Sequence, residues 1–594
     1  MSIINTNNER NALSRGVCIM VLVIFGAFFC LITSEVFHGS CWAGSSNPLS
    51  AFESSAFGLS DESMDENHSR ELSIFQALEM GLSNNFDIAI EGLNSSVARE
   101  NIIKLSSERG PKFNMELSTN YLDKLQNSID FASSSGIRNW EEKNWGVNSG
   151  VEFRTIQGTR YSLDYTVISR NNSLNRQAPS LNALFNPEVE TFMGLNVVQP
   201  LMKNSGKAVN LAAERIARIE VGLSDFRRRI LVNNKALEII SACYDLSFAN
   251  QNVSLREQAL EVAQRFLKLS KRRQELGKGD SADVDQAGIQ ISEAREKLLL
   301  ARDYQRRRNT ALLHEIMGSV TPETRLPDFR IPELDCPELP SGTAEIHIGE
   351  ALKNRPDYLM TLDQARVESI RRSYAGKQRL PELNISMSYG FHGIGNSHSR
   401  SFDVLNDWDE PEWSAALSYQ TPLDGFRGER SEMAIRDIRK QQALLNSDRM
   451  ASRIAIEIHD ALERIRLLSE RYKVTLQSRE LSQKAMDVEE KRYLNGRTSS
   501  FAVLELQDKV FNARTRELSA RLDLARALEE FRAARGVLLR DRGFLLKGEV
   551  MDAVDETEAG DFRQIRSDSQ GDASESSDRL NEIRKRLEEF RSRS

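Results

Sequence analysis

Histidines and cysteines are the side chains of this sequence whose spacing would most readily indicate a metal site or a nucleophile. There are seven histidines and five cysteines. No histidine has the spacing of a metal-ligand pair, and no Ser/His/Asp or Cys/His arrangement has a supporting context. His392 and His398 flank Gly393 and Gly395, but they lie between expected strands, without the strand-to-helix setting of a nucleotide site. The residues therefore predict no enzyme activity, no catalytic residue, no metal site and no cofactor.

Residues 1–43 have the pattern of an export signal. Two arginines precede the apolar stretch Gly16–Thr33, and Cys41 and Ala43 are small residues suited to a cleavage site. The alternative is an uncleaved segment that spans a membrane once, since the apolar stretch is long for a signal. A lipoprotein signal fits less well, because no cysteine here follows a good lipobox. Cleavage would leave two cysteines, whose spacing suggests neither a disulfide framework nor a metal site.

Two turns of similar sequence interrupt long helical patterns. They lie within Arg273–Val284 and Arg492–Glu505, and in both an arginine precedes a glycine by four residues. Gly277 and Gly496 stand where a helix C-cap favours a residue that tolerates a left-handed backbone. Any of the three residues Thr498–Ser500 can cap the helix that follows the second turn. Each turn therefore joins two long helices into a hairpin.

The turns belong to a duplication that runs through most of the chain. The windows Asp87–Pro111 and Asp357–Pro381 have the same length, and a short alternating run follows each of them. Each half therefore consists of a helix, strands, a long helix, a turn and another helix. We place the first repeat at residues 71–318 and the second at residues 345–539.

Three further segments flank or separate the repeats. Residues 44–70 are rich in Ser, Asn and acidic residues, and we expect them to be disordered. Residues 319–344 hold five of the chain's 14 prolines, which predicts an extended linker. Residues 540–594 form an acidic tail with a short amphipathic helix, whose apolar stripe is Leu580, Ile583, Leu587 and Phe590.

Six segments alternate between apolar and polar residues, as β-strands do. Four lie in the first half, around 113–121, 147–153, 161–167 and 193–197, and two in the second, around 384–391 and 413–419. We expect the segments between them, such as His392–Glu410, to be polar loops. One interpretation is a half-buried antiparallel sheet in a soluble domain. The other is a membrane barrel, which needs about eight strands or more and hence several chains.

Long helical patterns account for most of the remaining sequence. The longest are expected at about 206–276 and 430–495. The second carries one heptad row at Leu467, Val474, Leu481 and Val488, and another at Ile458, Ile465 and Tyr472. Two rows suit a wall in which each helix has a neighbour on both sides. The alternative is a plain antiparallel coiled-coil hairpin with a thick apolar face.

The composition fits long solvated helices better than thick globular cores. Among 594 residues, aromatic side chains make up 7% and charged side chains 28%. The net charge is −7 without a dominant basic patch, which argues against nucleic acid as a partner.

The layout and the motifs together resemble the TolC family of outer-membrane efflux proteins, over about residues 71–539. Each motif is weak alone, whereas their order and repetition are specific. The residues that carry the resemblance are Ala77-Leu78, Asn84-Asn85, Pro111, Gln199-Pro200-Leu201, Gly206, Arg273, Gly277, Asp283-Val284, Asn354-Arg355-Pro356-Asp357, Leu380-Pro381-Glu382-Leu383, Arg492-Tyr493, Gly496 and Val503-Leu504.

This resemblance implies a mixed α/β membrane protein that works as a homotrimer. Each chain would contribute four strands to a twelve-stranded β-barrel in outer-membrane lipid, and its long helical hairpins would form part of a periplasmic helical barrel. Such a protein is the passive exit duct of a tripartite efflux pump or of a type I secretion system. The implied partners are a periplasmic adaptor (membrane fusion) protein and an inner-membrane pump.

The resemblance also implies roles for the two turns. Asp283 occupies the family's acidic entrance position, and Tyr493 matches an aromatic residue that holds the entrance shut. Ala502 departs from the acid expected in the second repeat, while Glu505 keeps an acid one helical turn later. The tips that face the adaptor contain Gly277, Lys278, Gly496 and Arg497. Alternatively, Asp280 and Asp283 are simply acids in the first turn of a helix, where its dipole favours them.

A second departure is the number of strand segments between residues 113 and 198. Four stand where the family has two, so one pair is either a loop hairpin or an extension of the barrel. A structural coiled-coil protein anchored by an uncleaved N-terminal segment is the alternative to a channel. It predicts no membrane-inserted strands and a soluble protein once residues 1–43 are removed. The sequence does not identify an exported substrate, adaptor or pump.

Overall fold

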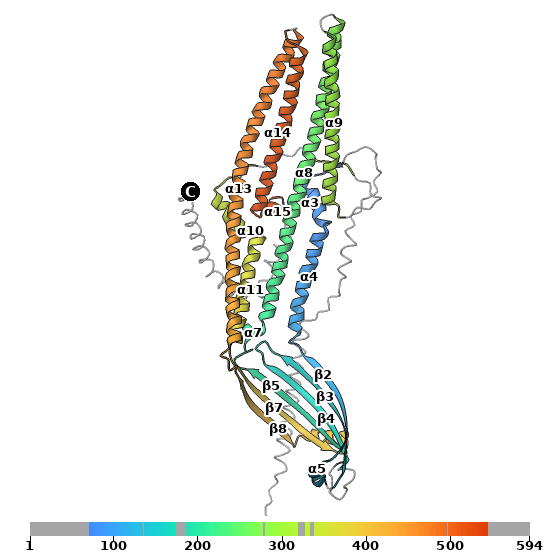
Figure 1. The fold of residues 1–594 in the computed structure, drawn as a ribbon, viewed down its shortest axis with the longest axis vertical. Coiled ribbons are helices and arrows are strands. Elements are labelled where there is room, and N and C mark those ends of the chain that lie inside the picture. Colours follow the sequence, from blue (N-terminus) through green and yellow to red (C-terminus); the bar gives the residue numbers. More distant parts are fainter. Residues whose placement is uncertain are drawn as a thin grey trace, which may run out of the picture. The chain divides into compact units, whose positions relative to one another are not determined.

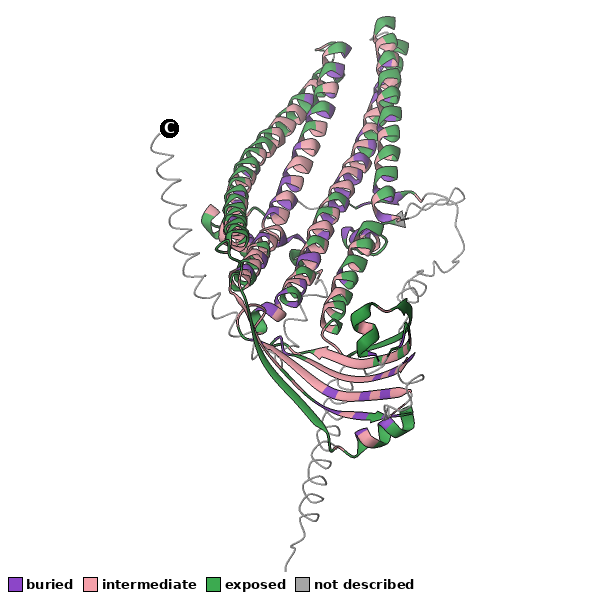
Figure 2. Ribbon diagram, turned by 60° about the horizontal axis from the view of Figure 1, so that its bottom comes forward, coloured by how far each residue is buried: buried purple, intermediate pink, exposed green. Residues whose placement is uncertain are grey.

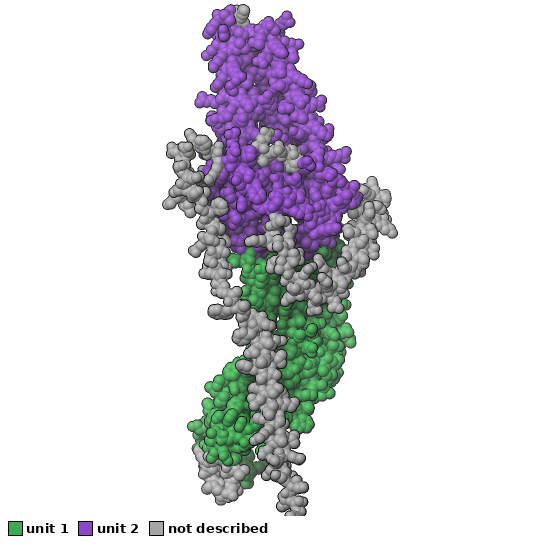
Figure 3. Space-filling model, turned by 180° about the vertical axis from the view of Figure 1, so that it is seen from behind, with its two compact units in different colours: residues 1–69, 92–225, 360–448 green, residues 70–91, 226–359, 449–594 purple. Residues whose placement is uncertain are grey.

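The computed structural model describes residues 70–134, 136–173, 185, 187–276, 280–318, 327–332, 338–495 and 497–544. These residues form two compact units (Figure 3). The sheet unit comprises the described parts of 92–225 and 360–448, and the hairpin unit those of 70–91, 226–359 and 449–544. The expected signal peptide, the segment 44–69 and the tail beyond residue 544 lie outside the described residues.

The two halves of the chain share one order of elements, two helices, strands, a long helix and a second long helix, with two more strands in the first half (Figure 1). The helices of the first half are α3 (Ile74–Ser83), α4 (Phe86–Ser107), α5 (Ser128–Ser133), α7 (Lys207–Asn210), α8 (Ala212–Glu275) and α9 (Ser281–Ile316). Those of the second half are α10 (Ala344–Asn354), α11 (Pro356–Gln378), α12 (His398–Asn406), α13 (Arg427–Leu494), α14 (Ser500–Ala534) and α15 (Leu538–Asp541). The tandem repeat is therefore confirmed. Within the described part of the chain, no helix is both long and apolar enough to cross a membrane.

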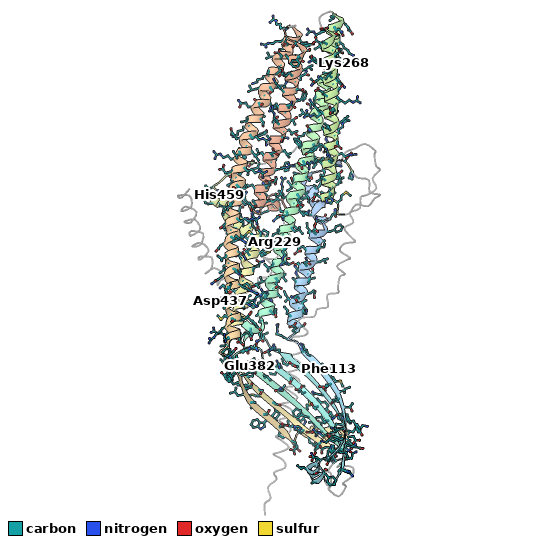
Figure 4. The ribbon with its side chains drawn as sticks, in the orientation of Figure 1. Phe113, Arg229, Lys268, Glu382, Asp437 and His459 are labelled. Carbon is teal, nitrogen blue, oxygen red and sulfur yellow. The ribbon has the colours of Figure 1, made fainter. Side chains whose placement is uncertain are left out.

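The described residues of the sheet unit include a six-stranded antiparallel sheet. Its strands, in spatial order, are β2 (Lys112–Leu125), β3 (Asn139–Arg154), β4 (Arg160–Asn172), β5 (Glu188–Pro200), β7 (Glu382–Gly395) and β8 (Pro411–Gln420). Phe113 near the start of β2 and Glu382 at the start of β7 mark the end of the sheet where helices of this unit continue (Figure 4). All four segments expected between residues 113 and 198 are thus strands of one sheet.

Each pairing in this sheet joins odd-numbered residues to odd-numbered residues. Leu117 pairs with Val147 and Val147 with Val167, and farther across the sheet Leu195 pairs with Tyr389. Side chains alternate between the two faces of a strand. All odd-numbered strand residues therefore share one face of the sheet, here called the odd face, and the even-numbered residues share the other, the even face.

The segment between β7 and β8 differs from the polar loop expected for His392–Glu410. β7 continues into this segment, and α12 follows it. The Ser397 hydroxyl caps α12 by accepting a backbone hydrogen bond at 3.3 Å. The buried residues Ser401 and Leu405 face β5 and β7. The expectation was wrong because a helix of nine residues is no longer than an ordinary loop, so its few apolar positions did not distinguish it from one.

Buried positions run along the long helices (Figure 2). In the hairpin unit, apolar packing joins the two halves of the chain through α14. Ala525 of α14 packs in a cluster with residues of α3, α8 and α9. Leu524 and Phe531, on the same helix, pack with Ile454 and Ile458 of α13. One helix therefore connects both hairpins. A parallel pair formed by β1 (Arg70–Glu71) and β6 (Phe329–Arg330) lies in the same unit.

A largely buried arginine ties the start of α11 to α13 and α14. Arg355 precedes Pro356, which takes the first helical position, where a missing N–H is tolerated. The Arg355 guanidinium lies 2.7 Å from Asp357 Oδ2 and 2.8 Å from Glu457 Oε2, and it donates to the Ala534 carbonyl at 3.2 Å. Burial raises the pKa of Asp357, but hydrogen bonds and charge from Arg355 outweigh it and leave this pKa below its usual value.

The substitution Asp357→Asn should lower the free energy of unfolding by about 1–3 kcal/mol at pH 7, because the buried guanidinium loses a charged partner. Since the pKa of Asp357 is depressed in the fold, its contribution is present above the unfolded-chain value of about 4 and is lost as the pH falls through the folded value. Thermal melting of the helical circular dichroism signal at pH 7 and pH 3 measures both effects.

The matched control is Asp303→Asn, because within the described parts of the chain Asp303 forms ion pairs only with the exposed Arg306 and Arg307. Equal melting of the two variants at pH 7 would contradict the assigned role of Asp357.

Candidate pore entrance at the helical hairpin ends

The candidate residues from the sequence lie at two helix ends of the hairpin unit, between α8 and α9 and between α13 and α14. Gly277, Lys278 and Gly496 fall outside the described residues. Arg497 has an exposed side chain, and its backbone N–H donates to the Arg492 carbonyl at 2.9 Å. The structure therefore describes the three residues expected at the entrance, but only Arg497 of the four expected at the adaptor-facing tips.

A side chain caps the start of α9 and of α14, the second helix of each hairpin. Asp280 accepts a hydrogen bond from the Ser281 backbone N–H at 2.6 Å, and Ser499 accepts one from the Ala502 backbone N–H at 3.4 Å. Three hydroxyl residues were possible caps for α14. Because Ser499 takes this position, the hydroxyl of Ser500 is left to make a different contact.

Tyr493, near the end of α13, is only 2% exposed. Its ring packs against Phe266 of α8 with centroids 5.3 Å apart, and the Arg273 guanidinium lies 4.2 Å from the Tyr493 ring centroid. The same guanidinium donates a hydrogen bond to the Tyr493 carbonyl at 2.5 Å. A cation–π contact and a charge-assisted hydrogen bond therefore join the two hairpins. The buried Tyr493 hydroxyl has no hydrogen-bond partner among the described residues.

Asp283 makes a second contact between the hairpins. It lies in the first turn of α9, and its Oδ1 accepts a hydrogen bond from the hydroxyl of Ser500, the buried first residue of α14. One turn later, Ala287 belongs to the same apolar cluster as Tyr493. We call Phe266, Arg273, Asp283, Tyr493 and Ser500 the tip junction. The carboxylate also lies in the first turn of α9, where the helix dipole favours an acid.

Glu505 does not take part in the tip junction. Its side chain is exposed, and its Oε1 lies 2.6 Å from Nζ of Lys509, four residues later on α14. Pairs this exposed contribute at most about 1 kcal/mol. The structure therefore gathers Asp283 and Tyr493 at one junction and gives Glu505 a separate partner.

Arg273 and Ser500 are tip-junction residues to which the sequence alone assigned no role at an entrance. An arginine four residues before the turn glycine was a visible signal in both repeats. However, Arg492, at the matching place, pairs with Glu489 of its own helix at 3.3 Å. The repeated spacing thus pointed to the arginine without showing which copy would reach the other hairpin.

The tip junction consists of polar and aromatic contacts between the two hairpins. No group of three or more His, Cys, Asp or Glu side chains in the described ranges is arranged to hold a metal ion. Burial raises the pKa of Cys243 in α8 to about 12, so this thiol is not a nucleophile near neutral pH. What the tip junction offers is a set of polar and aromatic contacts that can break and re-form.

The chain matches a known family model in both repeats. Residues 162–319 and 347–537 match the model described as outer membrane efflux protein, which covers more than half of the chain. The chain belongs to the outer membrane efflux protein family. As a member, it is an outer-membrane efflux channel with a periplasmic helical tunnel, and the resemblance seen in the sequence is confirmed. The first matched range begins within β4, after β2 and β3.

Solved structures of outer-membrane channels share this fold. CusC is 15% identical with a TM-score of 0.56, over 80% of this chain and 95% of CusC. OprN is 16% identical with a TM-score of 0.55, over 78% and 89% of the two chains. CmeC of Campylobacter jejuni is 15% identical with a TM-score of 0.52, over 78% and 86%. No curated protein sequence matches the chain significantly.

Arg273→Ala should let the two hairpin ends of this efflux channel separate. It removes both the cation–π contact and the hydrogen bond to Tyr493, together worth roughly 2–4 kcal/mol. Spin labels at Arg272→Cys and Arg497→Cys report the distance between the ends, and we expect a longer and broader distribution in the variant. Lys509→Ala removes only an exposed ion pair and serves as the control. An unchanged distribution in Arg273→Ala would show that Arg273 does not hold the ends together.

Proposed function

We propose that three copies of this channel form a passive conduit from the periplasm through the outer membrane, and that the protein has no enzyme activity. The observation that carries the proposal is the family match in both repeats, which accompanies a sheet and two long hairpins of the expected kind. The conduit would serve a tripartite efflux pump or a type I secretion system. Its partners would be a periplasmic adaptor protein and an inner-membrane pump.

An apolar row on α13 supports an assembly of several copies. Ile458 and Ile465 are 0% and 4% exposed and pack within the chain. The other heptad row remains exposed in the single chain, with Leu467 at 68%, Val474 at 58%, Leu481 at 58% and Val488 at 50%. Large apolar side chains at heptad spacing form the seam that one helix presents to another. In our proposal a neighbouring copy covers this row.

Replacing both Leu467 and Leu481 with serine should weaken the trimer without unfolding the chain. Each buried leucine contributes about 1.5–3 kcal/mol, so the association constant should fall by roughly a hundredfold or more. Native mass spectrometry in mild detergent measures the trimer fraction. Ile458→Ser is the matched control, because its effect should be on helix melting instead. A full trimer fraction in the double variant would refute the role of this row.

We also propose that the tip junction is the closed state of the channel entrance. The contacts of Arg273 with Tyr493 and of Ser500 with Asp283 would hold it shut. An adaptor and a pump that bind the open state more tightly would shift the equilibrium towards opening. In this proposal the adaptor meets the tips that contain Gly277, Lys278, Gly496 and Arg497. In a trimer, the acids Asp283 and Glu505 would surround a narrow passage and favour cations.

The double variant Asp283→Asn with Glu505→Gln should reduce cation selectivity, because it removes two negative charges per copy from the entrance. Reversal potentials in a planar lipid bilayer under a potassium chloride gradient measure this selectivity. Glu463→Gln changes an exposed acid elsewhere on α13 and should leave the reversal potential unchanged. If the double variant keeps the reversal potential of the unmodified protein, these acids do not set selectivity.

A further inference from the structure

The sheet has two strands more than the four per chain that the TolC resemblance implies. The additional strands lie in the first half, where β2 to β5 stand in place of two strands. We infer that all six strands belong to the membrane barrel and that three copies close a barrel of 18 strands. This inference rests on the proposed trimeric channel. It also names the partner of each free sheet edge, a second copy of this chain.

β3 and β4 are paired along nearly their whole length with both neighbours. The pairing includes Lys112–Leu125 of β2 with β3, Glu142–Arg154 of β3 with β4, and Arg160–Arg170 of β4 with β5. A hairpin that folded away as a loop would leave the sheet over part of this length. Strands of 16 and 13 residues also exceed the about 9–11 that a tilted strand needs to cross a bilayer.

The odd face is continuous across the additional strands. One row of paired residues runs over the whole sheet through Phe113, Val151, Leu163, Leu195, Tyr389 and Trp413. In each of the six described strands, five successive odd positions around this row carry no charge. On β3 and β4 these positions are Trp145, Val147, Ser149, Val151, Phe153, Tyr161, Leu163, Tyr165, Val167 and Ser169. A lipid-facing surface needs this pattern on every strand. The part of the odd face nearer the helices offers it, whereas farther along the strands α12 covers Thr191, through Ser401, and His398 reaches Tyr165 at 2.8 Å.

The even face of β3 and β4 has the opposite chemistry. It carries Glu152 and Arg160, which form an ion pair with a 3.3 Å separation. Thr166 donates a hydrogen bond to Asn148 across the two strands at 3.1 Å. Charged and polar groups of this kind are suited to a water-filled lumen and are costly in lipid. The additional strands thus have one face for lipid and one for water, as their neighbours do.

The turn between β3 and β4 is anchored at the helix end of the sheet. The backbone N–H of Gly206, next to α7, donates to the Gln157 carbonyl at 3.0 Å, and that of Arg154 donates to the Arg109 carbonyl at 3.1 Å. Gly158 in this turn has φ +96°, and a Cβ there would come within 2.6 Å of a backbone oxygen. The turn of the additional hairpin therefore lies at the end of the sheet where the other strands join their helices. From that end, β3 and β4 extend along the sheet beside their neighbours.

The two outer strands suit closure by further copies. β2 and β8 are the edges of the sheet among the described residues, and every residue in both is exposed in the single chain. Because six strands alternate in direction, β8 of one copy meets β2 of the next in antiparallel orientation, with the odd faces on the same side. An added pair of strands preserves this arrangement, whereas a single added strand would not. Lipid tolerates no open edge.

An 18-stranded barrel would have a wide lumen. Barrel diameter grows roughly in proportion to strand number, so the lumen would be about 1.5 times as wide as one of twelve strands. Barrels of about this size leave an aqueous channel. The narrowest passage would then be the entrance at the tip junction rather than the membrane barrel.

Single-cysteine labelling tests which face of the additional strands meets lipid. The mature chain, with Cys243→Ala and Cys336→Ser, is labelled with an environment-sensitive fluorophore and placed in phosphatidylcholine vesicles with nitroxide on the acyl chains. The odd-face sites are Val151→Cys and Leu163→Cys, and the matched even-face sites are Asn148→Cys and Ser162→Cys. We expect acyl-chain nitroxide to quench the odd-face labels about threefold or more, and iodide in the water to quench the even-face labels.

A matched pair on β8 separates this inference from the channel proposal. Any membrane barrel requires lipid quenching of Leu417→Cys, on the odd face, and iodide quenching of Ser414→Cys, on the even face. If Leu417→Cys escapes lipid quenching, the channel proposal itself fails. If Leu417→Cys is quenched by lipid while Val151→Cys and Leu163→Cys respond to iodide, the channel stands and the additional strands lie outside the barrel.

Electron microscopy of the detergent-purified assembly, viewed along the barrel axis, counts the strands directly. We expect 18 strands around a ring of three subunits, since each contributes six. A ring of twelve strands, with the additional hairpin outside it, would overturn the inference even if the assembly is a trimer.

Discussion

Backbone hydrogen bonding at the sheet edges is the constraint on which the architecture of this protein depends. In lipid, each N–H and C=O group needs a partner within the protein, so an open edge is not tolerated. The single chain leaves β2 and β8 exposed as edges within its described residues. An even number of strands, a register without slips and a band of uncharged side chains on one face are the features that allow such edges to join between copies. In the proposed assembly, the two edge strands of each sheet therefore pair with strands of neighbouring copies.

The helical hairpins of a single chain also leave an apolar surface uncovered. α14 has neighbours in both repeats, and its buried residues extend along the helix. α13 has one apolar row that is buried within the chain and a second that is exposed. A helix in a closed wall needs a neighbour on each side, whereas a helix in an isolated hairpin needs only one. The exposed row is the main reason to favour a tunnel of several chains over a solitary coiled coil.

The tip junction differs from these apolar surfaces in the kind of interaction that holds it. A cation–π contact, a charge-assisted hydrogen bond and the hydrogen bond from Ser500 to Asp283 are polar contacts between hairpins. Each is worth a few kcal/mol at most, which is within the range that binding of a partner can offset. The extended apolar packing along the helices is not so easily reversed. This contrast fits an entrance that opens while the wall remains intact.

The sequence by itself determined the repeat, the two hairpins, the six strand segments and the family. These features are periodic or local: alternation over nine residues, heptad rows on α13, a glycine after a helix, and Pro356 at the start of α11. They can be recognised without knowing what lies across the fold. Even the surplus of strands in the first half was visible in this way.

Only the tertiary structure decided which of these residues meet. It showed that Arg273 rather than Arg492 reaches the other hairpin, that Ser499 caps α14 while Ser500 contacts Asp283, and that Glu505 pairs within its own helix. It also revealed α12 and placed β3 and β4 within one sheet. The physical reason is the same for the contacts between hairpins and between strands. Each depends on the distance between segments far apart in the sequence or on a neighbouring surface, and packing sets both.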